Sequence, residues 1–244
     1  MPVLRTTALV CSVRVHGENG AVARLLTPDH GIIAGYVQGA RSRALRPVLI
    51  PGNAVEAEFR ARTADQLASL TIELKNSRGP WLGEPLCNAA LGWVTSITAA
   101  LLQERVTYPD VYSSLSALID AICHAPSARG WAGALVRYEL LLIDRLGFGL
   151  DLGRCVSTGL TEDLAFVSPR SAHAVSAAAA VGYEDRLMRL PPFLVKGGRP
   201  DWPDILDGLH LTGYFLERHL FADRHHDMMV ARNLLTDRLK RAIA

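Results

Sequence analysis

Three arginines close together, Arg41, Arg43 and Arg46, are the residues of this sequence whose types and spacing most suggest chemistry. No aspartate or glutamate occurs between His30 and Asn53, so their charge has no acidic neighbour along the chain. A group of guanidinium ions without a nearby carboxylate suits contacts with phosphate. The alternative is that arginines in a loop are ordinary solvated surface. The spacing alone leaves both interpretations open.

Further basic side chains could extend this positive surface. They lie on the polar faces of predicted strands, and they are Arg14, Arg24, Arg60 and Arg62. Aromatic rings also bear on single-stranded nucleic acid, because bases stack on exposed rings. Tyr36 is a candidate for this role, although a ring in a strand is more often part of the core, as we expect for Phe59.

Signatures of catalysis are missing from the sequence. The only lysines, Lys75, Lys196 and Lys240, do not follow a G-x-x-x-x-G run, so there is no Walker A motif for ATP. Neither a G-x-S-x-G elbow nor an H-E-x-x-H pair occurs. We therefore expect a protein that is not an enzyme and that needs no cofactor.

One dense group of potential metal ligands occurs late in the chain. It consists of Asp223, His225, His226 and Asp227. Between two helices such a group is more often a solvated connection in which an aspartate caps a helix, and a hydrolase built on it is a remote alternative. Glu56 and Glu58 share one strand face, where we expect them to neutralise nearby arginines rather than to form an acid–base pair.

The segments before and after the arginine cluster are predicted to be strands. Apolar and polar residues alternate from Leu9 to Val15, the period-two signature of a half-buried strand. The predicted inward face is Leu9, Cys11, Val13 and Val15. The hairpin turn at residues 17–20 predicts a return strand over residues 21–26, and a short apolar run predicts another over 32–37. Alternation predicts strands over 55–62 and 67–74, the last with Leu70, Ile72 and Leu74 inward. Five short strands separated by turns fit a small closed barrel such as the OB-fold.

Helical periodicity replaces this alternation after the turn residues 76–80. It predicts helices over residues 86–105, 109–124, 129–146, 172–181, 204–220 and 227–243, with a polar segment over 151–170. The prediction is a multidomain α+β protein, with an N-terminal barrel over residues 1–79 and an all-α domain over 80–244.

Composition narrows the class of protein. Of the 244 residues half are hydrophobic and a fifth charged, as in ordinary globular proteins, and the net charge is +2. Residues 1–75 hold nine Lys and Arg against six Asp and Glu, so the positive excess lies in the N-terminal part. No apolar run reaches the roughly 18 residues of a membrane span, and the start lacks a signal peptide, so we expect a cytoplasmic protein. The four cysteines form no C-x-x-C pair and are expected to be buried free thiols.

The first 75 residues resemble the RecO family of bacterial recombination mediators. The resemblance rests on the opening Val3-Leu4-Arg5-Thr6, the turn Gly17-Glu18-Asn19, the turn from Thr27 to Gly31 and the strand ending in Gly39-Ala40-Arg41. It implies an OB-fold that binds single- and double-stranded DNA and anneals complementary strands. It also implies that the protein acts together with RecR and binds the C-terminal tail of single-stranded-DNA-binding protein (SSB). In this role it would help to load RecA onto DNA coated by SSB.

Partner contacts in the helical part are expected at three residues. Arg137 and Tyr138 place a basic group beside an aromatic ring, and Arg232 lies in Ala231-Arg232-x-Leu234-Leu235, which resembles the last helix of the family. The alternative for Arg232 is an ordinary amphipathic helix with its basic residues in water.

A departure from the family occurs where its zinc module would lie. The segment from Leu146 to Cys155 resembles the approach to a site made of two C-x-x-C pairs, but Thr158 occupies the place of the second thiolate and no further cysteine follows. His173 could add one ligand, which still leaves fewer than the four that structural zinc requires. We expect residues 151–181 to be a metal-free remnant of the module, held by packing of Leu164, Phe166 and Val175.

A second class of function stays open on sequence alone. The barrel could belong to a protein-interaction adaptor whose loop arginines meet an acidic peptide. DNA binding that weakens strongly with salt would separate the two hypotheses.

Overall fold

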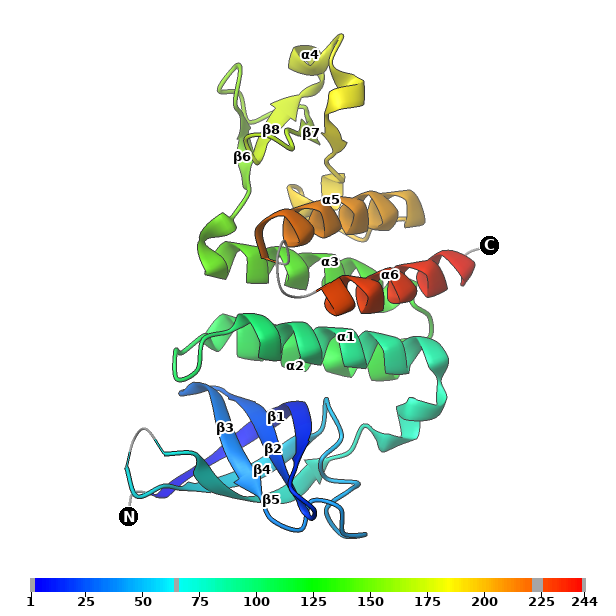
Figure 1. Ribbon diagram of the computed structural model, residues 1–244. Helices are drawn as coiled ribbons and strands as arrows, with labels where there is room; N and C mark the ends of the chain where they lie inside the picture. Colours follow the sequence, from blue (N-terminus) through cyan, green and yellow to red (C-terminus); the bar gives the residue numbers. More distant parts are fainter. Residues whose placement is uncertain (1–2, 64–65, 221–225, 243–244) are drawn as a thin grey trace. The chain divides into compact units, whose positions relative to one another are not determined.

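The computed structural model describes residues 3–63, 66–220 and 226–242 (Figure 1). The chain divides into two compact units, Met1–His124 and Ala125–Ala244. In the described residues, no helix has both the length and the apolar character needed to cross a membrane. The boundary predicted between residues 79 and 80 falls inside the first unit, because two helices after the barrel belong to the same compact body.

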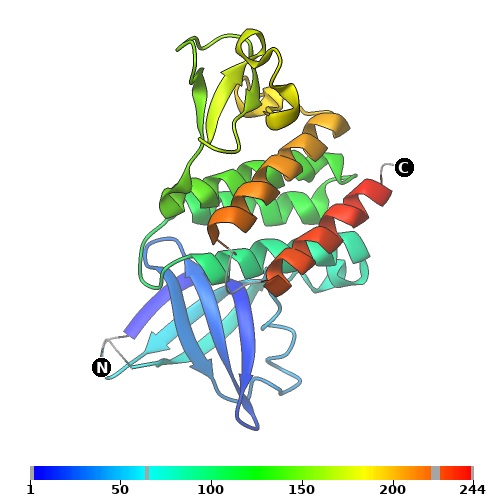
Figure 2. The ribbon, with the colours of Figure 1, turned by 45° about the horizontal axis from the view of Figure 1, so that its top comes forward.

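The first unit begins with a closed barrel. Its strands are β1 (Val3–His16), β2 (Gly20–Thr27), β3 (Gly31–Val37), β4 (Ala54–Arg60) and β5 (Ala68–Asn76). They close in the order β1-β2-β3-β5-β4, with β1 antiparallel to both β2 and β4 and with β3 parallel to β5. The long blue strand β1 bends around the barrel in both Figure 1 and Figure 2. This is the small closed barrel that the strand pattern predicted, and the OB-fold that the family resemblance implied.

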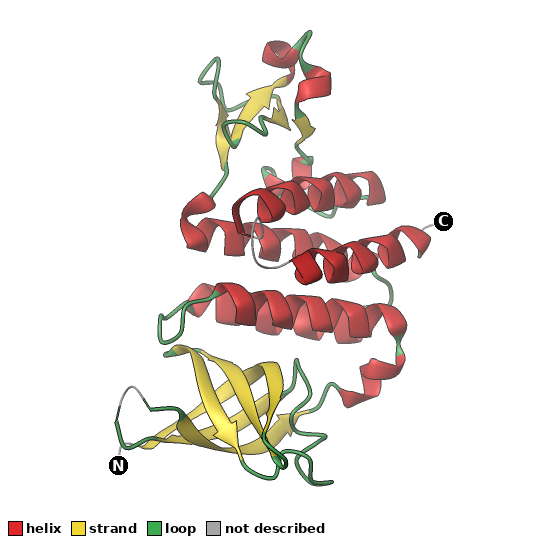
Figure 3. Cartoon of the chain, viewed as in Figure 1, coloured by secondary structure: helices red, strands yellow, loops and turns green. Residues whose placement is uncertain are grey.

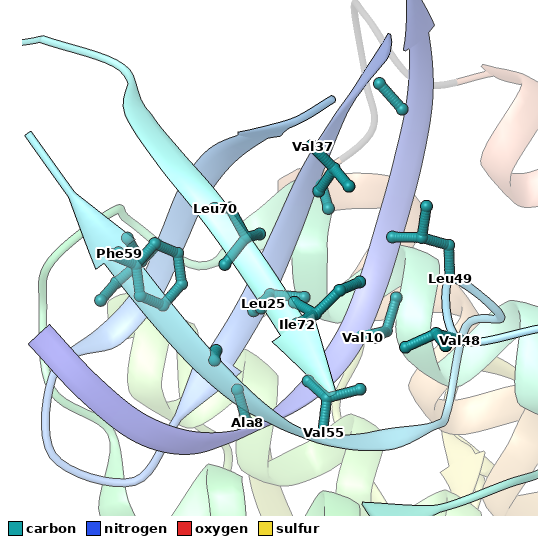
Figure 4. Close-up of a cluster of buried hydrophobic side chains, with 14 of the residues drawn as sticks. Ala8, Val10, Leu25, Val37, Val48, Leu49, Val55, Phe59, Leu70 and Ile72 are labelled. Carbon is teal, nitrogen blue, oxygen red and sulfur yellow. The ribbon is translucent and has the colours of Figure 1, made fainter. Parts of the chain in front are cut away.

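Apolar side chains from every strand fill the barrel. Figure 4 shows Phe59, Leu70 and Ile72 pointing into this core, as the alternation of β4 and β5 predicted. Leu74 was predicted to point inward as well, but 37% of it is exposed. It lies near the end of β5, where the core no longer covers the strand.

The inward face of β1 differs from the prediction. Ala8 and Val10 enter the barrel core, whereas Leu9 and Cys11 are buried on the opposite face of the strand, which packs against α1 (Pro85–Leu101). A bulge after Val10 then shifts the register, so that Val13 rejoins the barrel core. Burial raises the pKa of the Cys11 thiol to about 12, as expected for an inert buried cysteine.

Two helices complete the first unit. After a 3-10 turn, η1 (Gly79–Gly83), α1 is followed by α2 (Pro109–His124), whose bounds match the prediction. The connection between them lies against the barrel, where the Arg105 backbone N–H donates to the Ile32 carbonyl over 2.9 Å. Gly31 is required there, because a Cβ at this residue would lie 1.9 Å from the Val106 carbonyl oxygen.

Helices of the second unit are joined by a buried ion pair. They are α3 (Arg129–Ile143) with a final π turn η2 (Asp144–Phe148), α5 (Trp202–Leu220) and α6 (His226–Arg241). Arg232 of α6 donates to both carboxylate oxygens of Glu139 in α3, over 2.9 and 2.7 Å, and also to Thr212 of α5. The alternative interpretation, in which Arg232 faces water, is therefore wrong.

The helical part of the chain was predicted to be all-α, but the second unit also contains strands. A small sheet with the order β6-β8-β7-β9 follows α3, and Figure 3 shows its strands in yellow. Its members are β6 (Asp151–Cys155), β7 (Leu164–Val167), β8 (His173–Ser176) and β9 (Met188–Arg189), with the short helices α4 (Ala177–Ala180), η3 (Glu184–Arg186) and η4 (Pro192–Leu194). The helix expected over residues 172–181 is one strand plus a single turn, because cross-strand pairing outweighs the helix propensity of a short alanine run.

Packing holds this sheet together. Cys155, Phe166, Val175 and Ala180 form its core and Leu164 packs against them, which confirms the predicted apolar contacts. Within residues 3–63, 66–220 and 226–242, no three His, Cys, Asp or Glu side chains are grouped so as to hold a metal ion. Asp223 and His225 of the predicted ligand group lie outside the described residues.

Candidate nucleic-acid interface

The loop between β3 and β4 carries the three clustered arginines in an ordered turn. The Ser42 hydroxyl accepts from the Leu45 N–H over 3.2 Å, and the Ser42 carbonyl accepts from the Arg46 N–H over 3.0 Å. Val48 and Leu49 then enter the barrel core (Figure 4). These contacts fix the backbone of the loop in place.

A buried asparagine holds the end of this loop. The Asn53 side-chain amide donates to the carbonyls of Pro47 and Val48 over 2.8 and 3.0 Å. Its carbonyl oxygen accepts from the Arg78 backbone N–H over 2.7 Å. Because Asn53 is fully buried, its hydrogen bonds are shielded from water and the loop backbone is preorganised.

The arginines of the loop remain exposed and uncompensated. Arg41, Arg43 and Arg46 are all exposed, and none forms an ion pair with another described residue. Arg41 and Arg46 line one pocket of about 390 Å³, whereas Arg43 does not. The rest of the pocket is Val13, Val15, Gly20, Ala21, Ala40 and Leu49. A cationic rim therefore surrounds an apolar floor.

The outer face of the neighbouring strands carries basic and aromatic groups. Arg14 pairs across the strands with Val22, which pairs in turn with Tyr36, so the three side chains form one row. His16 meets the Tyr36 ring edge-on at 6.0 Å between centroids. The ring also lies over Gly20, where a Cβ would come within 2.1 Å of its hydroxyl oxygen. Tyr36 is thus half-buried and held in position, with part of its ring accessible.

His16 and the apolar residues of the pocket were not predicted as site residues. A signal for His16 was available, since it lies two residues after Arg14 and period-two alternation puts both on one face. The pocket carries no such signal. It combines the β1–β2 hairpin with Ala40 and Leu49 from the loop, and only the closed barrel brings them together.

Other predicted arginines are compensated. Glu58 accepts from Arg60 and, over 2.6 Å, from Arg5, and these hydrogen bonds, with Arg60 the larger cause, lower the pKa of Glu58. Arg24 approaches Glu104 at 3.5 Å. The expectation that Glu58 neutralises nearby arginines is confirmed, while Glu56 pairs with Lys75 instead.

The predicted basic surface is also not continuous. Arg60 pairs with Val3 at the start of β1, on the order of 35 Å along the strand from Arg14 at about 3.3 Å per residue. Arg62 is exposed just beyond the end of β4. The candidate interface therefore consists of Arg14, His16, Tyr36 and the arginine loop, all around the β1–β2 hairpin.

The three expected partner-binding residues of the second unit differ in exposure. Arg137 is exposed, but its guanidinium lies 5.0 Å above the Phe193 ring and donates to the carbonyls of Phe193 and Gly198 over 3.1 and 3.2 Å. Tyr138 and Arg232 are only 2% and 3% exposed, so both are interior residues and not contact residues. Tyr138 follows Arg137 by one position on α3 and points to its buried face.

Comparison with known proteins agrees with this architecture. The family model described as Recombination protein O N terminal matches residues 1–78, and the one described as Recombination protein O C terminal matches residues 84–228. The chain is 44% identical to the "DNA repair protein RecO" of Rhodospirillum centenum, over 96% of this chain and 94% of that protein. Relatives of the same name from Phenylobacterium zucineum and a Jannaschia species are 43% and 39% identical, covering 96% and 97% of their own lengths. With both halves matched and relatives similar over nearly their whole lengths, the chain belongs to the RecO family of DNA repair proteins.

Proposed function

We propose that this protein acts in DNA repair by binding single- and double-stranded DNA at the candidate interface and by annealing complementary strands. The observation that carries the proposal is the exposed, preorganised arginine loop, whose charges have no carboxylate partner among the described residues. Guanidinium groups placed in this way are available for phosphates, and their contacts release counterions.

Annealing by such a surface requires no catalytic centre. Two complementary strands repel each other through their phosphates, and a basic surface that lowers this repulsion brings them within pairing distance. The missing catalytic motifs support a role without enzymatic activity. Tyr36 and His16 beside the basic groups suit single strands, because their rings offer a stacking surface.

Family membership supports the remaining parts of the proposal. We infer that the protein works in the cytoplasm with RecR, and that it helps load RecA onto DNA coated by SSB. The second unit is the proposed docking site for the acidic SSB tail, with Arg137 as the exposed basic residue among those expected to contact it.

Fluorescence anisotropy of labelled oligonucleotides over a salt series tests the DNA-binding step. We expect saturable binding of single strands and duplexes whose affinity falls steeply as salt rises. A parallel assay should show faster annealing of complementary strands at low salt. Binding that is absent, or that does not change with salt, would favour the adaptor hypothesis, in which an acidic peptide is the ligand.

A further inference from the structure

The pocket at the β1–β2 hairpin combines features that phosphate binding alone does not explain. Arg41 and Arg46 flank it, but its floor is apolar and open to solvent, with Val15 62% exposed. Covering an exposed valine side chain with a ligand is favourable, because apolar surface is removed from water. The place of Val15 in one pocket with two arginines indicates a ligand that has both an apolar surface and a negative charge.

The pocket has the size and rigidity of a binding site. Its volume of about 390 Å³ lies in the range of about 300–1,000 Å³ that is usual for small-molecule sites. Ala40 and Leu49 of its floor are 7% and 8% exposed members of the barrel core. Because Asn53 and Ser42 fix the loop backbone, the two arginines extend from a preorganised part of the chain before any ligand arrives.

Charge complementarity limits what can occupy it. None of the described residues that line the pocket is acidic, and two are arginine. A nucleotide within a strand complements this lining, because its base has a flat face that can pack on apolar side chains and the phosphates on either side of it are anionic. His16 at the end of β1 and Tyr36 on β3, both on the outer face of the barrel, offer aromatic surface for further bases, which an acidic peptide would not need.

We propose that this pocket binds one unstacked base of single-stranded DNA, with Arg41 and Arg46 on the phosphates that flank it. The inference rests on the proposed function and names the form of DNA that the site prefers. In a duplex the bases are stacked and paired, so the pocket stays empty and only the phosphate contacts remain. The site therefore distinguishes single strands from duplexes without reading their sequence.

The test compares oligonucleotides that differ only in their bases. A thymidine strand and an abasic strand of equal length carry the same phosphates. Wild-type protein should bind the thymidine strand more tightly by about tenfold or more, with the same salt dependence for both. A 2-aminopurine placed within the strand should brighten on binding, because it leaves its stacked neighbours.

Two matched variants locate the effect. Val15→Asp puts a carboxylate in the pocket, and Val3→Asp puts the same charge at the other end of β1, where the valine is also exposed. We expect Val15→Asp to reduce the preference for base-containing DNA and Val3→Asp to preserve it. Thermal melting checks that both variants fold, and the 2-aminopurine signal of the wild type gives a measurement that needs no variant.

The outcomes separate this inference from the proposed function. Salt-dependent binding with no 2-aminopurine change would overturn the base pocket, and so would equal effects of the two variants. A wild type that binds no DNA at all would overturn the proposed function itself. If Val15→Asp abolished binding of a labelled aspartate-rich peptide containing phenylalanine but kept the preference for bases, the pocket would be a peptide site and the inference would be wrong.

Discussion

Arginine residues serve three different purposes in this protein, and their surroundings decide which. Arg41, Arg43 and Arg46 are exposed and free of ion pairs with described residues. Arg60 is exposed but shares Glu58 with a second arginine. Arg232 is buried and holds three helices together. The same type of side chain thus serves the proposed DNA contacts, forms a weak surface pair or stabilises the fold.

Removing the loop arginines should weaken DNA binding in a specific way. In the variant with Arg41, Arg43 and Arg46 replaced by Ala, the log–log salt slope should flatten by roughly 2 to 3 units, because each lost phosphate contact frees about one fewer counterion. Sequence preference should not change. The melting temperature should stay near that of the wild type, since exposed charges contribute little to folding.

A double variant provides the control for this measurement. Arg5→Ala with Arg60→Ala removes two arginines that Glu58 already compensates, so its salt slope should stay close to that of the wild type. Equal slopes for the triple variant and the wild type would show that the loop is ordinary surface. The DNA-binding face would then have to include other basic residues, such as Arg14 and Arg62.

The buried arginine should behave in the opposite manner. Arg232→Ala leaves the Glu139 carboxylate buried without its cation, which should cost about 3 to 5 kcal/mol of unfolding free energy. Urea denaturation followed by circular dichroism measures the loss. Lys240→Ala, at an exposed pair with Asp237, is the matched control and should change stability by less than about 0.5 kcal/mol. A similarly small loss for Arg232→Ala would contradict a structural role.

At the scale of elements, the β6-β8-β7-β9 sheet shows how a module can persist without its expected metal ligands. The Cys155 thiol accepts from the Ser176 N–H over 3.3 Å and from its hydroxyl over 3.5 Å. Burial raises the pKa of the Cys155 thiol, but hydrogen bonds from Ser176 and Thr158 together outweigh burial and lower this pKa to about 6. Cys155 thus keeps the thiolate character of a metal ligand, although a single thiolate cannot hold structural zinc.

Metal analysis tests this segment directly. After gel filtration the full chain should contain much less than one zinc per molecule, and a chelator should leave its melting temperature unchanged. Any small amount of zinc that Cys155 binds should be absent from the Cys155→Ala variant. About one zinc per chain that resists mild chelation would contradict the prediction and would direct attention to His173 and to residues outside those described.

At the scale of the whole molecule, the two proposed binding sites lie in different compact units. The candidate interface lies entirely in Met1–His124, whereas the proposed docking site for the SSB tail lies in Ala125–Ala244. A labelled tail peptide should therefore bind the full chain saturably at low salt. The triple arginine variant should lose DNA affinity and keep peptide affinity. Absence of peptide binding, or its loss in that variant, would contradict this division.

Much of the architecture follows from the sequence alone. Alternation and apolar runs between turns located all five barrel strands, and helical periodicity placed α2 and the start of α3. The stretch without acids identified the arginine loop, and the missing cysteines identified the altered module. These features depend on neighbouring residues, so they can be deduced without knowing the tertiary contacts.

The tertiary structure decided which faces are covered and which charges are paired. Leu9 and Cys11 are buried on the face of β1 that packs against α1, Ala8 and Val10 enter the barrel core instead, and the bulge after Val10 returns Val13 to that core. Pairing of β7 with β8 converted an expected helix into a strand. Arg232 is buried because it pairs with Glu139, which lies 93 positions away in the chain. Burial and ion pairing depend on residues far apart in the chain, so local patterns predicted the elements but not these partners.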